Sequence, residues 1–289
     1  MEIYVFVTMC IITCIYFLRN GPTLAGIIGG YKVWTYIEPL PYKQIQLYDH
    51  SGEIPVFFDL CIEKMKQSTN NLVVLTPENI QDYLPNFPLQ MGENAKYPLK
   101  KRIDLLFACI LEKYGGLCLS PGTILYKLNE IFSQTYYCDL VSVGGSPSVI
   151  QASSSNIYPN SYVIGSKKGS PFMKIYKQEL LKHINNPPIQ SYNILSRLIQ
   201  LYKPKQYHFG TEYDGTMNKN MKLITVNEYL GNFPIEFLSK DKLYLISFPY
   251  DILYNRSEYK WFLNLSEKQF KHSDTQVNKL LHLLHLLHL

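Results

Sequence analysis

The stretch Lys101–Ile124, KRIDLLFACILEKYGGLCLSPGTI, decides the fold. Apolar residues recur every three or four positions through its first half, which predicts an amphipathic helix ending at Tyr114. Gly115-Gly116 supplies a residue that can end this helix in the left-handed conformation. The apolar run Leu117–Leu119 is then long enough only for a brief buried strand, and Ser120-Pro121-Gly122 turns the chain sharply after it.

The lengths of this helix and strand predict which residues meet. At 1.5 Å per residue the helix covers roughly 15 Å from Tyr114 back to Asp104, and at 3.3 Å per residue the strand covers about 13 Å from Gly116 to Ser120. The two run antiparallel, so we expect Asp104 to lie beside the turn Ser120–Thr123. Ligands of open α/β sheets bind beyond the carboxyl ends of the strands. The sequence therefore predicts a ligand site at this turn.

Other segments alternate between strand and helix patterns. The expected strands are Lys32–Glu38, Leu72–Leu75, Leu140–Val143 and Tyr162–Gly165, and the expected helices are Pro55–Gln67, Pro171–Ile184 and Ser191–Tyr202. Polar segments Asn86–Pro98 and Ser148–Asn160 are expected to be loops. The alternation up to Thr123 predicts an α/β domain with a mainly parallel sheet.

The central block resembles the donor-site block of glycosyltransferases with the type-A fold, in particular the capsular-polysaccharide-synthesis and DXD-containing sugar-transferase families. Asp104 matches their helix aspartate, and Tyr114-Gly115-Gly116 matches their glycine stop. Phe107 stands where an arginine is expected, and Ser120-Pro121-Gly122 stands where Asp-X-Asp is expected. The resemblance implies a type-A, Rossmann-like fold, a nucleotide-sugar donor and a glycan or polysaccharide acceptor.

The departures bear on metal chemistry. Mg²⁺ and Mn²⁺ need hard oxygen ligands, and a serine hydroxyl and a glycine cannot replace two carboxylates. We therefore expect no required metal, with a divalent ion as the less favoured alternative. Lys100, Lys101 and Arg102 begin the same helix, where the macrodipole also favours an anion, so they are candidates to bind the donor diphosphate. A solvated basic helix start is the alternative.

The resemblance also suggests roles for residues outside the central block. In the type-A fold the end of the first strand carries the nucleotide base, which here points to Thr35, Tyr36 and Glu38. The alternative is a core role, which is the more common one for a tyrosine at a strand end. With Ser120, Gly122 and Thr123, Tyr36 and Glu38 complete the expected donor-binding set.

A second candidate catalytic carboxylate lies far along the chain. Glu212 and Asp214 fall on one side of a strand-like run from His208 to Gly215. We take Asp214, with Asp104, as a candidate catalytic residue. The alternative is a hairpin turn built on Asp214-Gly215, the usual structural role of that dipeptide.

The composition excludes several classes of protein. A net charge of +5 without a basic stripe and interleaved aromatic residues argues against nucleic-acid binding. The six cysteines form no Cys-x-x-Cys pair, which favours buried thiols over disulfides or zinc. No Gly-x-Ser-x-Gly or His-Glu-x-x-His motif occurs, which argues against α/β-hydrolases and zincins.

The two ends of the chain have compositions of their own. An uncharged apolar run, Ile3–Leu18, predicts a single-pass membrane anchor, with a cleaved signal peptide or a first buried element as alternatives. Arg19 and Lys32 follow it, which favours a cytosolic main domain. The predicted organisation is an anchor (residues 1–20), a linker (21–31), a glycosyltransferase-like domain (32–279) and a frayed, low-complexity Leu/His tail (280–289).

Two functions fit these patterns. The first is a membrane-anchored glycosyltransferase that works without an Asp-X-Asp metal site. The second is a catalytically silent protein of the same fold that acts as a partner or scaffold in glycan synthesis.

Overall fold

The computed structural model describes residues 31–39, 54–92, 94–145, 159, 161–185 and 191–287. The chain divides into two units, residues 1–31 and 32–289, and every helix and strand named below belongs to the second unit. The expected anchor, the linker up to residue 30 and most of the loop Ser148–Asn160 lie outside the described residues. Within the described ranges, no helix is both long enough and apolar enough to cross a membrane.

A six-stranded sheet forms the frame of the second unit, in the strand order β2-β1-β3-β6-β5-β7. Its strands are β1 (Val33–Tyr36), β2 (Leu72–Leu75), β3 (Gly116–Leu119), β5 (Leu140–Val143), β6 (Val163–Ser166) and β7 (Gln206–Phe209). All neighbouring pairs are parallel except those that involve β6, which is antiparallel to both β3 and β5. The prediction of a mainly parallel α/β sheet is confirmed.

A smaller antiparallel sheet pairs β4 (Thr123–Leu125) with β8 (Leu245–Ser247). The sequence analysis did not predict this sheet or the reversed direction of β6. Because β4 follows β3 after only three residues, the small sheet fixes the turn Ser120–Gly122 between two paired strands.

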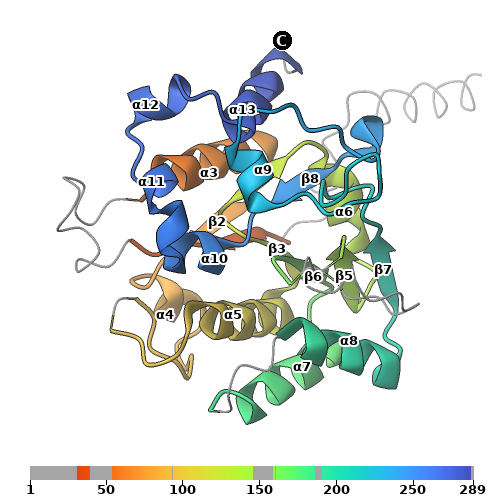
Figure 1. The fold of residues 1–289 in the computed structure, drawn as a ribbon. Helices are drawn as coiled ribbons and strands as arrows, with labels where there is room; N and C mark the ends of the chain where they lie inside the picture. Colours follow the sequence, from red (N-terminus) through yellow and green to blue (C-terminus); the bar gives the residue numbers. More distant parts are fainter. Residues whose placement is uncertain are drawn as a thin grey trace, which may run out of the picture. The chain divides into compact units, whose positions relative to one another are not determined.

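Helices flank the six-stranded sheet on both faces. Helices α5, α7 and α8 lie on one face, and α3, α9, α12 and α13 lie on the other (Figure 1). The helices are α3 (Val56–Ser68), α4 (Ile80–Tyr83), α5 (Leu99–Tyr114), α6 (Leu128–Gln134), α7 (Pro171–Lys182), α8 (Ser191–Tyr202), α9 (Val226–Leu230), α10 (Tyr250–Asn255), α11 (Lys260–Leu263), α12 (Glu267–Lys271) and α13 (Gln276–Leu287). The helices expected at Pro55–Gln67, Pro171–Ile184 and Ser191–Tyr202 are thus confirmed to within two residues at each end.

The α5–β3 connection has the form that its sequence predicts. Gly115 has φ 69° and Gly116 has φ 99°, both in the left-handed region. A Cβ atom on Gly116 would lie 2.1 Å from the Lys32 carbonyl oxygen, so only glycine fits beside β1. The indole of Trp34 donates to the Gly115 carbonyl over 3.0 Å and fastens the end of α5 to β1.

The C-terminal segment differs from the expected frayed tail. Helix α13 runs to Leu287, and Val277, Leu280 and Leu281 are buried. The Gln276 backbone N–H donates to the Gly231 carbonyl over 2.9 Å, which holds the start of the helix near α9. Leu280 and Leu281, the first two residues of the expected tail, are thus buried residues of a helix.

The cysteines of the described residues fit the expectation of free thiols. Cys61, Cys118 and Cys138 are buried, Cys109 is half-buried, and none of the four forms a disulfide. Burial is the first cause that raises the pKa of each of these thiols, so each stays protonated near neutral pH.

Candidate functional site

Several strand ends meet at one edge of the six-stranded sheet. β1, β3 and β5 end there, and the antiparallel strand β6 begins there. The residues at these ends are Glu38, Ser120, Gly144 and Tyr162. The Ser120 backbone N–H donates to the Tyr162 carbonyl over 2.8 Å, which joins the turn after β3 to the start of β6. This carboxyl edge is where a ligand site is expected.

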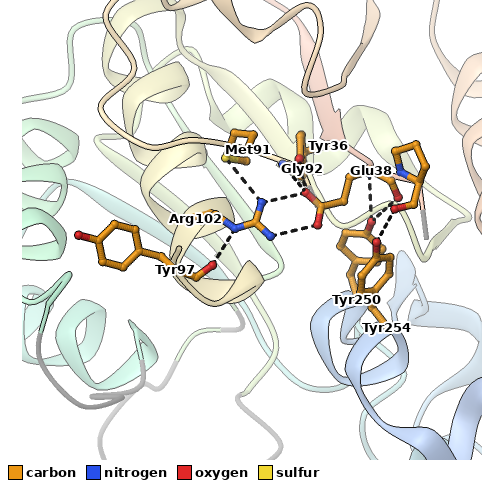
Figure 2. A network of polar contacts seen from close by, with 9 residues as sticks. Tyr36, Glu38, Met91, Gly92, Tyr97, Arg102, Tyr250 and Tyr254 are labelled. Carbon is orange, nitrogen blue, oxygen red and sulfur yellow. Dashed lines mark hydrogen bonds and ion pairs between the residues drawn. The ribbon is translucent and has the colours of Figure 1, made fainter. Parts of the chain in front are cut away.

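A buried ion pair connects β1 with α5 at this edge. Nη1 and Nη2 of Arg102 donate to Oε2 and Oε1 of Glu38 over 2.8 and 3.0 Å (Figure 2). Arg102 is 5% exposed and Glu38 is 3% exposed, so both charges have left water. The Nε of Arg102 also donates to the Tyr97 carbonyl over 2.9 Å. A two-pronged pair of this kind is the geometry that compensates the cost of burying both charges.

Neighbouring groups form further hydrogen bonds with Glu38. The Tyr36 hydroxyl donates to Oε2 over 2.6 Å, and the Gly92 backbone N–H donates to the same oxygen over 3.2 Å. The Glu38 backbone N–H donates to the Tyr250 hydroxyl over 3.1 Å. Burial, followed by the charge of Glu38, raises the pKa of the Tyr36 phenol, which therefore stays protonated and keeps donating. Tyr36, Glu38 and Arg102 thus form one closed network.

The first turn of α5 carries a second polar cluster. Lys100 forms an ion pair with Asp104 one turn along, and its Nζ donates to the Ser161 hydroxyl over 2.7 Å. The same Nζ lies 4.7 Å from the centre of the Tyr162 ring, within the range of a cation–π contact. Lys100 thereby links Asp104 to Tyr162, whose backbone carbonyl accepts from the Ser120 N–H.

Tyr162 extends this cluster toward the C-terminal part of the domain. Its hydroxyl donates to Oδ1 of Asp251, in the first turn of α10, over 2.6 Å. Burial, and then Asp251, raises the pKa of the Tyr162 phenol, so the phenol remains a donor. Asp104 and Asp251 therefore lie on two different elements that Tyr162 and Lys100 join.

The three basic residues that begin α5 point in different directions. Lys101 donates to the carbonyls of His183 and Ile184 after α7, over 3.3 and 3.0 Å. Lys100 instead reaches Ser161, before β6, and Arg102 reaches Glu38, after β1. Consecutive helical residues diverge by about 100°, which explains why the three side chains point in different directions. Of the three, Lys100 is the one bonded beside the Ser120 turn.

The turn Ser120–Thr123 is built into the fold. The Ser120 hydroxyl donates to the Phe248 carbonyl over 3.0 Å, and the Thr123 hydroxyl lies 3.2 Å from that of Ser247. Ser120 is 2% exposed and Thr123 is fully buried. A Cβ atom on Gly122 would lie 3.2 Å from Phe248 Cβ, so the turn packs closely on β8. The side chains of this turn therefore bond to the protein itself.

Asp214 lies at the same edge, against the end of β5. A Cβ atom on Gly144, which has φ +63°, would lie 1.5 Å from Oδ2 of Asp214. Oδ1 of Asp214 accepts from the backbone N–H and the hydroxyl of Thr216 over 3.0 and 2.7 Å, while Oδ2 has no hydrogen-bond partner among the described residues. Burial raises the pKa of this carboxyl to about 7, although the bonds from Thr216 oppose the rise. A carboxyl of this kind changes its charge near neutral pH.

The residues around Asp214 do not form the hairpin considered above. They do turn, with the Tyr213 backbone N–H donating to the Gly210 carbonyl over 3.1 Å. β7 pairs with β5, however, and an antiparallel bridge follows only at Met217 and Leu223. A turn is thus present at Asp214-Gly215, but no antiparallel strand pair flanks it among the described residues, and Asp214 lies beside Gly144.

Residues 51–233 match the family described as capsular polysaccharide synthesis protein. The chain belongs to this family. No curated protein and no solved structure matched it. Membership of the capsular polysaccharide synthesis family confirms the resemblance at the level of the family, and it indicates a glycosyltransferase-like role in polysaccharide synthesis.

Two residues of the site were missed in the sequence analysis, one inside the matched region and one beyond it. Ser161 lies between the expected loop Ser148–Asn160 and the expected strand Tyr162–Gly165, and nothing in the sequence marked its hydroxyl as a partner of Lys100. Asp251 lies beyond the matched region, and its contact with Tyr162 spans 89 residues of sequence. A tyrosine at a strand start and an aspartate in the first turn of a helix are common, so neither pattern identifies a site. Among the described residues, no three His, Cys, Asp or Glu side chains gather into a group that could hold a metal ion.

Proposed function

We propose that this protein is a glycosyltransferase that transfers a sugar from a nucleotide-sugar donor to a glycan or polysaccharide acceptor. Family membership supports the reaction class. The polar side chains at the carboxyl edge of the sheet support this edge as the location of the site, because ligands of open α/β sheets bind there. The donor diphosphate would bind at the amino end of α5, where the helix macrodipole favours an anion.

The observation that carries the proposal is the position of Lys100. Its ammonium lies among the Asp104 carboxylate, the Ser161 hydroxyl and the Tyr162 ring, next to the Ser120 turn. When the bond from the anomeric carbon to the diphosphate breaks, negative charge grows on the phosphate oxygen. In our proposal Lys100 donates to that oxygen, and Asp104 holds the ammonium in place or accepts from a donor sugar hydroxyl.

Asp214 is our candidate for the general base. The acceptor hydroxyl attacks the anomeric carbon and must lose a proton, and a base with a pKa near the working pH is suited to take it. Asp214 has a pKa raised to about 7 and an Oδ2 atom that bonds to no described residue. In the proposed reaction the proton of the acceptor hydroxyl passes to this carboxylate, and the nucleoside diphosphate leaves.

We also propose that transfer needs no metal at an Asp-X-Asp site, with Mn²⁺ or Mg²⁺ as the alternative. Ser120-Pro121-Gly122 occupies the position where the resemblance places that motif, and the Ser120 hydroxyl donates to the Phe248 carbonyl. Ser120, Gly122 and Thr123 would then shape the donor site through the backbone of the turn. The wall of the donor site beside the nucleotide would consist of Tyr36, Glu38 and Arg102. Their polar groups bond to one another, so they would shape the site.

The membrane attachment belongs to the proposal as well. The apolar run at residues 3–18 would anchor the protein, with the main domain on the cytosolic side. Its acceptor would then be a growing glycan near the membrane surface.

An assay of sugar transfer and of nucleotide-sugar hydrolysis tests the proposed reaction. The full chain is incubated with radiolabelled UDP- and GDP-sugars, and release of free sugar or of the nucleotide is measured. We expect turnover of at least one donor, a loss of at least tenfold in Lys100→Ala and Asp214→Asn, and little change in Lys101→Ala. Failure to turn over any donor would contradict an enzymatic role.

One observation favours the second candidate, a silent partner in glycan synthesis. The Ser120–Thr123 turn is buried and bonded to β8, so its side chains bind the fold rather than a ligand. A silent partner would bind nucleotide sugar or glycan without releasing free sugar or nucleotide. The same assay, combined with a binding measurement, separates the two candidates.

A further inference from the structure

A separate pocket lies in the loops that follow Asp214. It has a volume of about 350 Å³ and is lined by residues between Asn218 and Glu236, including Asn218, Lys219 and Asn220 in the turn between Met217 and Leu223. Pockets that bind small ligands usually have volumes of about 300 to 1,000 Å³, so this one could hold one or two sugar rings. None of its lining residues belongs to the clusters at the carboxyl edge.

Side-chain amides line the pocket. Oδ1 of Asn218 accepts from the backbone N–H groups of Asn220 and Lys222 over 2.9 and 3.0 Å, so this residue holds the loop in shape. Asn220 and Asn227 also line the pocket, and each carries a side-chain amide. Each amide offers two donors and an acceptor, which matches the hydroxyl groups of a sugar, since a hydroxyl both donates and accepts.

An exposed aromatic ring completes the lining. Phe233 is 82% exposed, the largest exposure among the large hydrophobic residues of the described chain. Leaving a phenyl group in water forfeits about 1.5 to 3 kcal/mol of burial energy, so an exposed ring at a pocket calls for a ligand that covers it. The C–H face of a pyranose ring is such a partner, because aromatic faces are electron-rich.

The charges of the pocket indicate a neutral ligand. Lys219 is paired with Glu236 over 2.5 Å. Oε2 of Glu228 accepts from the backbone N–H and hydroxyl of Thr225 over 2.7 and 2.8 Å, at the start of α9. The lining therefore carries one lysine against two glutamates, which disfavours phosphate, nucleotide and uronic acid groups.

The pocket shares its framework with Asp214. The Ile224 backbone N–H donates to the carbonyl of Thr216, whose hydroxyl and N–H bond Asp214. The hydroxyl of Tyr229, next to Glu228, donates to the Gly215 carbonyl over 2.5 Å. The loop that positions Asp214 therefore also builds the pocket.

We propose that this pocket is a binding site for a neutral saccharide segment, in which Phe233 stacks on a pyranose face and the amides of Asn220 and Asn227 bond its hydroxyls. That the segment belongs to the acceptor chain rests on the proposed transferase function. Saccharide binding itself does not.

Calorimetric titration of the full chain tests the site, with maltotetraose, cellotetraose and chitotetraose as neutral probes and hyaluronan tetrasaccharide and UDP as anionic ones. The asparagine side chains are labelled with ¹⁵N to locate binding. We expect a neutral probe to bind and to shift the side-chain signals of Asn220 and Asn227. Phe233→Ala should weaken that binding about tenfold, equivalent to about 1.4 kcal/mol, and Phe233→Tyr should retain it. Trp261→Ala is the matched control, because Trp261 is 49% exposed and lies outside the pocket.

The outcomes separate this proposal from the proposed function. If no neutral probe binds, if Phe233→Ala binds as tightly as the wild type, or if only the anionic probes shift the two amides, the pocket is not a neutral saccharide site. If a neutral probe binds in the wild type and not in Phe233→Ala, the site is established even when the nucleotide sugars are not turned over. Loss of turnover with intact saccharide binding contradicts the transferase alone.

Discussion

Arg102 and Glu38 form a two-pronged ion pair across 64 residues of sequence, with N–O distances of 2.8 and 3.0 Å. The pair fixes the rotation of α5 about its own axis, because Arg102 can reach the end of β1 from one helical face alone. Lys100 then faces β6 and Lys101 faces the end of α7. The Arg102–Glu38 ion pair thus orients Lys100, the residue to which we assign donor binding.

Removing Glu38 tests the structural part of this arrangement. Glu38→Ala leaves the Arg102 charge buried without its partner, and breaking a buried pair in this way costs about 3 to 5 kcal/mol. Urea denaturation of the wild type and the variant measures the difference. Glu63→Ala is the control, since it breaks the exposed pair with Lys66 (2.6 Å) and should cost less than about 1 kcal/mol. Equal losses of unfolding free energy in the two variants would show that the buried pair stabilises the fold no more than an exposed pair does.

The contact between Gly144 and Asp214 predicts a difference between two glycines. Gly144→Ala places a Cβ atom 1.5 Å from Asp214 Oδ2, whereas Gly169→Ala, at a similar φ of +70°, meets nothing within 4 Å. The left-handed conformation alone costs about 1 to 2 kcal/mol. Gly144→Ala should therefore lose clearly more stability than Gly169→Ala in thermal unfolding. Matching losses would mean that the close approach is absent.

Burial of Asp214 predicts a pH-dependent stability. Its pKa is about 7 in the folded protein against 3.8 for the free carboxyl, so between these values the folded state binds the extra proton. The Asp214 carboxyl therefore makes its whole contribution to the free energy of unfolding below about pH 4. That free energy falls by on the order of 4 kcal/mol as the pH rises to about 7. Asp214→Asn removes that loss.

The measurement is urea denaturation of Asp214→Asn and the wild type at about pH 5 and about pH 8. The advantage of the variant should grow from the lower to the higher pH. Asp274→Asn, an exposed surface change, should show no such growth. An Asp214→Asn difference that is constant with pH would mean that the carboxyl titrates normally.

Chelation tests the proposed absence of a metal requirement. Donor turnover should be the same before and after dialysis against EDTA, because the Ser120 turn offers no pair of carboxylates. Activity that disappears with EDTA and returns with Mn²⁺ would point to ligands elsewhere, with Asp104 and Asp214 as the first to be mutated.

Local patterns predicted much of this fold. The boundary between α5 and β3 follows from apolar spacing and two glycines, and Gly116 is required because the Lys32 carbonyl passes so close. β5 and α8 begin and end where their patterns indicated. The reversed β6 could not be predicted, because strand direction depends on which neighbours a strand pairs with and not on its own residues.

The candidate site could be predicted only in part from the sequence, because some of its contacts join segments that are distant along the chain. Asp104 and Lys100 lie one helical turn apart, and local geometry brings them together. Their partners Ser161 and Asp251 come from distant segments, and no periodicity connects them. The closed network of Tyr36, Glu38 and Arg102 was expected to face a donor, yet its polar atoms bond to one another, because only the fold shows how deeply they are buried.

The most direct test of the central claim is a thermal-shift titration of the full chain with UDP- and GDP-sugars in the presence of EDTA. Wild type, Lys100→Ala and Lys101→Ala are compared, since the two lysines are adjacent and Lys100 bonds Ser161 whereas Lys101 bonds the carbonyls that follow α7. We predict that at least one nucleotide sugar at about 100 times its Kd stabilises the wild type by about 2.7 kcal/mol. We also predict that Lys101→Ala retains most of the shift and that Lys100→Ala loses most of it. Absence of any shift in the wild type, or equal shifts in all three proteins, would contradict donor binding at this end of α5.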